Sequence, residues 1–256
     1  MDPQQVGDLI FNEARMGRWF PEALRGRLTL DEALRAQLAV RNRKVGMGGR
    51  QGGWKIGLTS GRVRKRYGTD ARPFGHIMAD DIYESGATVP LRRFPHASLE
   101  PELCFTIGET LRGPGITPAQ VRQATAAVSP GFELNQGRAQ GVKDFPLTVA
   151  DNLSQWGIVA GSPLQPIPAT LDLARLKVTL RRGGEVVAET LGGPETIDDH
   201  FLSLSILVNT LAVYGEVLAA GMRVITGSFA KVDVAAGQTW TADFAGIGEV
   251  QVSFEP

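Results

Sequence analysis

The first forty residues of the chain show hydrophobic residues at the spacing of α-helices. After Asp2 and Pro3, which favour the start of a helix, apolar residues recur every three to four positions. Thr29 and Glu32 then form a capping box, in which each side chain satisfies a free backbone donor of the other residue. Two N-terminal helices are therefore predicted within residues 1–50.

Beyond this region the pattern changes to short alternating segments and turns. The glycine-rich residues 46–53 predict a mobile loop or turn, and they lack the Gly-Lys-Ser/Thr ending of a phosphate loop. Strands are predicted over residues 54–60 and 99–107. The clearest hairpin covers residues 176–190, where Gly183-Gly184 supplies the turn.

Two further helices are predicted among these strands. Thr117 and Gln120 form a second capping box, and Ser129-Pro130 is expected to stop the helix that they start. The longest helix is expected over residues 196–220, with Gly221 just beyond its end. Helices at both flanks with sheets between them predict an α+β fold.

Composition excludes several classes of protein. Lys plus Arg and Asp plus Glu each number 27, so no basic surface for nucleic acid is expected. The start of the chain has no features of a signal peptide, and no apolar run has the length of a membrane span. The single cysteine, Cys104, rules out an intrachain disulfide and suggests the reducing cytoplasm.

One short segment is strongly basic, Arg62-Val63-Arg64-Lys65-Arg66. Such a run is typical of a solvated helix face. The alternative interpretation is local attraction for an anionic substrate.

Glu100-Pro101-Glu102 is the most informative local feature. In a strand the two carboxylates would lie on one face, where burial would force one of them to take a proton. Mg²⁺ or Mn²⁺ would remove that conflict, since both prefer oxygen ligands. Pro101 cannot donate to a central ladder and therefore indicates an edge or a bulge. The alternative is a solvent-facing edge with two ordinary glutamates.

Two more residues are candidates on weaker grounds. Glu133 lies between apolar neighbours after a predicted helix, and a return of the chain could bring it beside the first pair. Lys55 follows Trp54 in an apolar run, where a lysine could move protons or anchor a carboxylate, or could reach water with its ammonium. Asp80-Asp81 fits either a turn or a base.

Taken together in their order, these segments resemble a known family. The chain is similar to the 2-keto-4-pentenoate hydratase and 4-oxalocrotonate decarboxylase family, within the fumarylacetoacetate hydrolase-like superfamily. The resemblance is carried by Lys55-Ile56-Gly57-Leu58-Thr59-Ser60, Phe74-Gly75-His76-Ile77-Met78-Ala79-Asp80, Leu99-Glu100-Pro101-Glu102-Leu103-Cys104-Phe105, Phe132-Glu133-Leu134, Val149-Ala150-Asp151-Asn152-Leu153-Ser154 and Ile225-Thr226-Gly227-Ser228.

The resemblance implies a site and a fold. Its metal ligands for Mg²⁺ or Mn²⁺ would be Glu100, Glu102 and Glu133, and its catalytic residues Lys55 and Asp80. Substrate-binding positions would be Thr59, Ser154 and Ser228. The fold would be a mixed β-roll with flanking helices, in a single catalytic domain over residues 1–256, with a helical subregion at residues 1–50 and a β-rich core holding the metal site at residues 51–256.

The implied function is the addition of water to a 2-hydroxy-2,4-dienoate, giving a 4-hydroxy-2-oxo acid in the catabolism of aromatic compounds. The alternative is a decarboxylase of an oxalocrotonate-type diacid, which an extra cationic side chain from Arg62–Arg66 would favour. A carbon–carbon hydrolase of an acylpyruvate and a non-catalytic partner subunit rank lower. The resemblance also implies a cytoplasmic homo-oligomer acting on a small acid, and it raises the expectation of a complex with another enzyme of the pathway.

Overall fold

A computed structural model of the chain describes residues 1–94, 96–193 and 196–255. The strands of the larger sheet are Gln51–Ile56 (β1), Phe74–Met78 (β2), Ile82–Glu84 (β3), Ala97–Ile107 (β5), Thr125–Gln136 (β6), Gln155–Ala160 (β7), Arg223–Ser228 (β10) and Val232–Asp233 (β11). Within the described residues they pair in the order β2-β1-β10-β5-β6-β7-β3, with β11 on β5. The sheet mixes parallel and antiparallel pairs.

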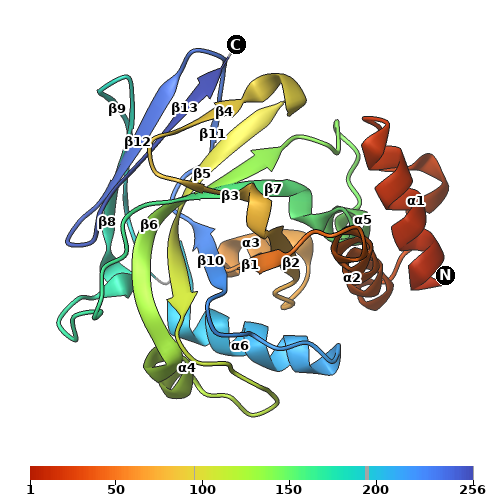
Figure 1. Cartoon of the computed structure of the whole chain (residues 1–256), viewed down its shortest axis with the longest axis horizontal. Coiled ribbons are helices and arrows are strands. Elements are labelled where there is room, and N and C mark those ends of the chain that lie inside the picture. The colour runs from red at the N-terminus through yellow and green to blue at the C-terminus, as the bar shows by residue number, and fades with distance from the viewer. Residues whose placement is uncertain (95, 194–195, 256) are drawn as a thin grey trace.

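This sheet curls until β2, at one end of the order, contacts β7 near the other end (Figure 1). A small apolar cluster is buried separately from the main core, and its members come from strands all around the sheet: Ile77, Cys104, Ile158, Ala160 and Ile225. Side chains of one strand parity therefore face a common interior. The predicted mixed β-roll is confirmed.

A second sheet packs against the roll. Its strands are Ala87–Pro90 (β4), Lys177–Arg182 (β8), Glu185–Leu191 (β9), Thr239–Phe244 (β12) and Gly248–Glu255 (β13), in the order β4-β13-β12-β8-β9. The predicted hairpin is β8–β9, and its turn residues Gly183 and Gly184 have φ angles of 56° and 92°. Both angles lie where glycine is favoured, as a two-residue hairpin turn requires.

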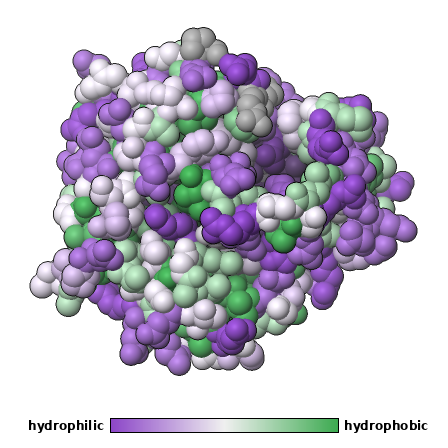
Figure 2. Space-filling view, viewed as in Figure 1, coloured by the Kyte–Doolittle hydropathy of each residue, from purple (hydrophilic) through white to green (hydrophobic). Residues whose placement is uncertain are grey.

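The α-helices lie around the larger sheet (Figure 1), at Pro3–Arg15 (α1), Leu30–Gly46 (α2), Gly61–Tyr67 (α3), Pro118–Ala124 (α4), Phe145–Ala150 (α5) and His200–Val213 (α6). Both predicted capping boxes are present, at Thr29 with Glu32 and at Thr117 with Gln120. α1 packs on α2, and α2 packs on α5 and β2, so the N-terminal helices cover one side of the roll. On the face shown in Figure 2, apolar residues lie in small groups among polar ones.

Two helix predictions were too long. The helix predicted over residues 196–220 covers only α6, because Gly215 has φ 74° and turns the chain after the C-cap at Tyr214. The helix that begins after Thr117 ends at Ala124, and Pro130 lies within β6 instead of stopping a helix. Long-range pairing with β5 decided the second case, since every residue from Ala127 to Gln136 is paired with that strand.

The glycine-rich segment is only partly a loop. Gly52 and Gly53 belong to β1, which begins at Gln51. A Cβ atom on Gly53 would lie 1.9 Å from the backbone oxygen of Arg223 on the neighbouring strand. These glycines therefore allow close approach of two strands, where the sequence suggested mobility.

Pro101 lies in β5, which is a central strand and not an edge. The pairing of β10 with β5 shifts register between Ile225 and Ser228, and regular pairing with β11 resumes at Leu99. The ladder is thus irregular on that side of Pro101, as the expected bulge requires.

Within the described residues, no helix has the length and apolarity to cross a membrane. The division into a helical subregion at residues 1–50 and a core at 51–256 stays a prediction.

Candidate metal centre

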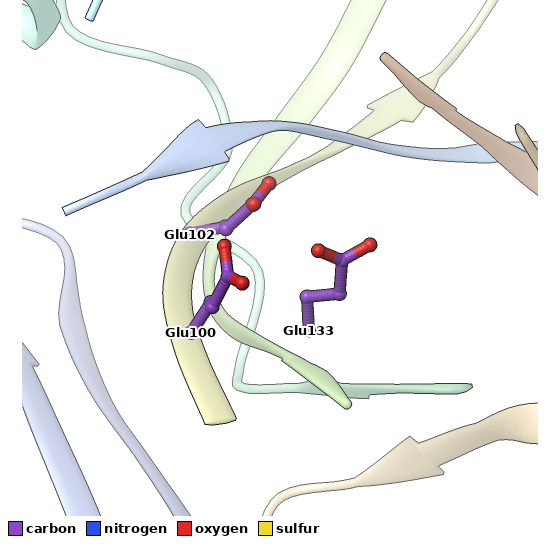
Figure 3. A group of neighbouring side chains, drawn as sticks. All are labelled: Glu100, Glu102 and Glu133. Carbon is purple, nitrogen blue, oxygen red and sulfur yellow. The ribbon is translucent and has the colours of Figure 1, made fainter. Parts of the chain in front are cut away.

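Three carboxylates meet inside the roll. Glu100 lies directly opposite Glu133 in the β5–β6 pair, and Glu102 shares the face of Glu100 two residues further along β5. One ligand atom from each residue lies within 4.8 Å of the others, and Figure 3 shows the three side chains around a common space. Glu102 is paired with Gly131, which has no side chain to occupy that space.

Glu100 and Glu133 are each held by an ion pair and by Asn135. Lys55 forms an ion pair with Glu133, and Lys231 Nζ lies 2.7 Å from Glu100 Oε1. Asn135 Nδ2 donates to Glu133 Oε2 at 2.8 Å and to Glu100 Oε1 at 3.1 Å. These contacts orient the carboxylates, but two lysines offset only two of three negative charges.

Burial makes this charge costly. Glu102 is 3% exposed and Glu133 1% exposed. Burial raises the pKa of Glu102 well above its usual range, and the nearby Glu133 raises it further. Burial also raises the pKa of Glu133, although Lys55 opposes that effect. A divalent cation bound by the three carboxylates would take the place of the protons that burial favours, so these residues fit Mg²⁺ or Mn²⁺.

Lys55 lies on β1 with its side chain beside the triad. It is 7% exposed, and its register partner on β2 is Gly75. A Cβ atom on Gly75 would lie 2.8 Å from Lys55 Cγ, so this glycine makes room for the lysine stem. A buried lysine next to a carboxylate can hold or move a proton at its Nζ.

Thr59 lies against Gly227, and Gly227 contacts the triad. Gly227 donates its backbone N–H to Glu102 Oε2 at 2.7 Å. Gly227 has φ 103°, and a Cβ atom there would lie 2.0 Å from Thr59 Oγ1. The Thr59 hydroxyl is therefore packed against the residue that holds Glu102, which places it next to the candidate metal centre.

Ser154 ends an unusual left-handed turn. Asn152, Leu153 and Ser154 have φ angles of 56°, 55° and 62°. Each such non-glycine residue costs roughly 1–2 kcal/mol, so surrounding contacts must hold the turn. Asn152 Oδ1 accepts from His76 N at 2.8 Å and would lie 2.9 Å from a Cβ on Gly75, the residue opposite Lys55. Backbone strain is thus located beside Lys55.

The last two candidate site residues are Ser228 and Asp80. Ser228 is opposite Glu102 in the β10–β5 register, but its hydroxyl donates to the backbone oxygen of Ala230 at 2.5 Å. Asp80 is exposed and follows Met78, whose partner Gln51 lies at the far end of β1 from Lys55. Three strand residues from Gly75 to Met78 alone span about 10 Å. Asp80 is not a member of the buried group formed by Glu100, Glu102 and Glu133.

The basic run at residues 62–66 has both exposed and inward-pointing side chains. Arg62, Lys65 and Arg66 are exposed, as on a solvated helix face. Arg64 instead points inward, where its Nη1 donates to Leu58 O at 2.6 Å and to Asp198 Oδ2 at 2.7 Å.

Arg72 Nε donates to the same Asp198 oxygen at 2.8 Å, and Asp198 N donates to Thr59 O at 2.7 Å. Two guanidinium groups thus share one carboxylate next to Thr59, so these three side chains together carry one net positive charge.

Sequence reasoning missed Asn135, Lys231 and the role of Gly227. Asn135 lies two residues after Glu133, so strand alternation could have placed both on one face. Lys231 lies after β10 with no spacing that links it to Glu100. The contact of Gly227 with Glu102 depends on a backbone N–H, which carries no sequence signal.

No protein-family model matches the chain, but individual known proteins are similar to it. A 4-oxalocrotonate decarboxylase from a Pseudomonas species is 32% identical over 89% of this chain and 86% of its own length. A 2-keto-4-pentenoate hydratase from Paraburkholderia xenovorans is also 32% identical, over 89% of this chain and 85% of its own. These relatives are enzymes, either hydratases or decarboxylases.

A solved structure supports the same assignment. The 4-oxalocrotonate decarboxylase of Pseudomonas putida, complexed with magnesium and adipate, superposes with a TM-score of 0.89 at 27% identity, over 98% of this chain and 97% of that one. That relative was crystallised with Mg²⁺, and the expected Mg²⁺ or Mn²⁺ cofactor is confirmed as fitting the acidic triad here. This chain belongs to the 2-keto-4-pentenoate hydratase and 4-oxalocrotonate decarboxylase family.

Proposed function

We propose that the protein is a metal-dependent hydratase, which adds water to a 2-hydroxy-2,4-dienoate to give a 4-hydroxy-2-oxo acid in the catabolism of aromatic compounds. The observation that carries this proposal is the buried carboxylate triad with Lys55 in ion-pair contact. The relatives named as hydratases of such acids support it. A bound Mg²⁺ or Mn²⁺ would supply a Lewis acid that stabilises negative charge on the oxygens of a 2-oxo acid.

The side chains of this site would each have a separate role in binding or proton transfer. Glu100, Glu102 and Glu133 hold the cation, and Asn135 and Gly227 orient their carboxylates. Lys55 Nζ holds the proton that is moved on or off the carbon chain of the substrate, since it is buried and borders the triad. Thr59, which lies against Gly227, and Ser154 would contact the substrate. Asp80 is exposed and lies outside the carboxylate group, so it is not given a step here.

A second candidate, decarboxylation of an oxalocrotonate-type diacid, is favoured by one observation. Arg64 and Arg72 share the carboxylate of Asp198 beside Thr59, so a net positive charge lies near the proposed substrate position. A second substrate carboxylate would match that charge. Relatives named as decarboxylases and as the hydratase of a seven-carbon dioate act on diacids of this kind.

The deciding experiment offers the purified protein 2-hydroxy-2,4-dienoates with one or two carboxylates, in the presence of Mg²⁺ or Mn²⁺. Loss of dienol ultraviolet absorbance without release of CO₂ is the expected result. Release of CO₂ from the diacid would establish the decarboxylase instead.

Two variants connect any activity to the site. Glu102→Gln should abolish turnover and Mg²⁺ binding, whereas Glu109→Gln, at an exposed position after β5, should change neither. The hydratase and decarboxylase proposals would both be abandoned if the wild type bound no divalent metal and turned over none of these acids.

We also propose that the protein acts in the cytoplasm as a homo-oligomer. Complex formation with another enzyme of the same pathway is part of this proposal. Size-exclusion chromatography with light scattering, alone and with the candidate partner, measures both.

A further inference from the structure

A partly open pocket lies outside the roll, between the N-terminal helices and the outer face of β2. Its volume is about 290 Å³, just below the roughly 300–1,000 Å³ typical of small-molecule sites. Ile10 and Phe11 of α1, Val40 of α2 and Met78 of β2 form apolar walls. A site of this size would accommodate a ligand with a single ring.

Lys44 supplies a cation at this cavity. Its Nζ lies 3.3 Å from His76 Nε2, and the carboxylates of Asp81 and Asp151 line the same cavity. Burial lowers the pKa of Lys44. An ammonium group has three donors, so the contact with His76 leaves two of them for other acceptors.

His76 can accept a hydrogen bond from Lys44 only when its imidazole ring is neutral. Burial lowers the pKa of His76 well below its usual value, and Lys44 lowers it further. Because the ammonium of Lys44 can only donate, His76 Nε2 accepts, and His76 Nδ1 donates to Gln37 Oε1 at 3.3 Å. Gln37 Nε2 in turn donates to Phe74 O at 2.6 Å. The chain of hydrogen bonds fixes His76 and leaves Lys44 directed at the cavity.

Other lining residues are aromatic or carry hydrogen-bond donors. Phe94 and Trp156 stack with ring centroids 3.5 Å apart and an interplanar angle of 7°. Trp156 Nε1 and Gln155 Nε2 are buried donors with no acceptor among the described residues, and both residues line the cavity. Buried donors without partners are uncommon in native proteins and are often satisfied by a ligand or by water.

The charges around the cavity favour an anion. Arg15, Lys44 and Arg138 face two carboxylates, Asp81 and Asp151, and Asp151 is already paired with Arg138 at 3.2 Å. Among the described residues that line the cavity, cationic side chains therefore outnumber anionic ones by one.

We propose that this cavity is a second ligand site, which takes a small organic acid with one flat apolar ring and holds its carboxylate at Lys44. The apolar helix residues and the aromatic pair would cover the ring, and the carboxylate would accept the remaining donors of Lys44. The site is separate from the metal centre, because His76 faces the cavity while the adjacent Gly75 borders Lys55 on the other side of β2.

Isothermal titration of the metal-free protein with benzoate tests this site, with EDTA present so that the triad cannot recruit benzoate through a cation. One benzoate per chain should bind with a dissociation constant below about 1 mM, and benzamide, which lacks the charge, should bind at least about tenfold more weakly. Lys44→Met should weaken benzoate binding at least about tenfold. Lys177→Met, on the distant strand β8, should leave it unchanged.

Glu102→Gln should also bind benzoate as the wild type does, because the triad is not involved. Ala14→Leu, which narrows the cavity from α1 without changing charge, should weaken binding and serves if Lys44→Met does not fold. The proposal is overturned by any of three results: no saturable binding of benzoate, equal binding of benzamide, or loss of binding in Glu102→Gln.

Discussion

The backbone N–H of Gly227 donates to Glu102 Oε2 at 2.7 Å, so a strand end 125 residues away in sequence orients one candidate metal ligand. Gly227→Ala should displace that strand end, because the new Cβ would lie 2.0 Å from Thr59 Oγ1. Partners that orient metal ligands typically contribute about 10- to 100-fold to metal affinity. We therefore expect Gly227→Ala to weaken Mg²⁺ binding by at least about tenfold, measured by calorimetry.

Gly86→Ala is the matched control for backbone strain. Gly86 has φ 91°, close to the 103° of Gly227, but a Cβ atom there would meet nothing within 4 Å. It should share the loss of stability that comes from the positive φ and keep normal Mg²⁺ affinity. Equal Mg²⁺ affinities of the two variants would mean that the contact with Thr59 is unimportant.

Lys55→Met should damage both stability and turnover. Removing the lysine leaves Glu133 buried without its cation, which typically costs about 3–5 kcal/mol of the free energy of unfolding. Denaturant unfolding of the metal-free variant measures that loss. If Lys55 moves the substrate proton, kcat of the metal-loaded enzyme should fall by at least about 100-fold.

Lys231→Met provides the comparison, since Lys231 pairs with Glu100 at 2.7 Å but its side chain is 59% exposed. Exposed ion pairs contribute about 1 kcal/mol or less, so this variant should unfold almost as the wild type does. A similar loss of kcat in both lysine variants would argue that charge near the triad matters more than proton transfer by Lys55.

Asp80→Asn should lower kcat by less than about tenfold, below the usual contribution of a general acid or base. The family resemblance makes Asp80 a catalytic residue, whereas the β1–β2 register places it beyond Met78, away from Lys55. Steady-state kinetics with saturating Mg²⁺ decides between the two. A fall of 100-fold or more would restore Asp80 to the mechanism and would require β2 or a second subunit to bring it closer.

The stability of the protein should fall in mild acid, in part because of His200. Burial lowers the pKa of His200 from 6.5 to about 4. Between these values the unfolded chain binds a proton that the folded protein does not, so the free energy of unfolding decreases as pH falls from 6.5 to about 4. The contribution is about 3 kcal/mol. Chemical denaturation across this pH range should show it.

His200→Asn should flatten that part of the pH dependence, while keeping a group able to bond Thr226 Oγ1, which lies 2.7 Å from His200 Nδ1. His96→Gln, at an exposed position, should leave the pH dependence as in the wild type. Identical slopes in the wild type and His200→Asn would show that His200 does not titrate as its burial implies.

Local patterns predicted those elements that depend on neighbouring residues. The capping boxes at Thr29 and Thr117 are present because each involves residues only three positions apart. The Gly183-Gly184 hairpin formed for the same reason. The order of the motifs around Lys55, Glu100 and Glu133 was enough to identify the family, which the comparisons confirmed.

Only the tertiary structure decided what lies across the strands. Sheet register set Glu100 opposite Glu133 and placed Gly227 at Glu102, while the same kind of register separated Asp80 from Lys55. Register depends on pairing between segments far apart in the chain, and a shift of one residue would reverse every side chain. The sequence thus determined which carboxylates were available and the family to which they belong, and the curled sheet determined which of them share one buried space.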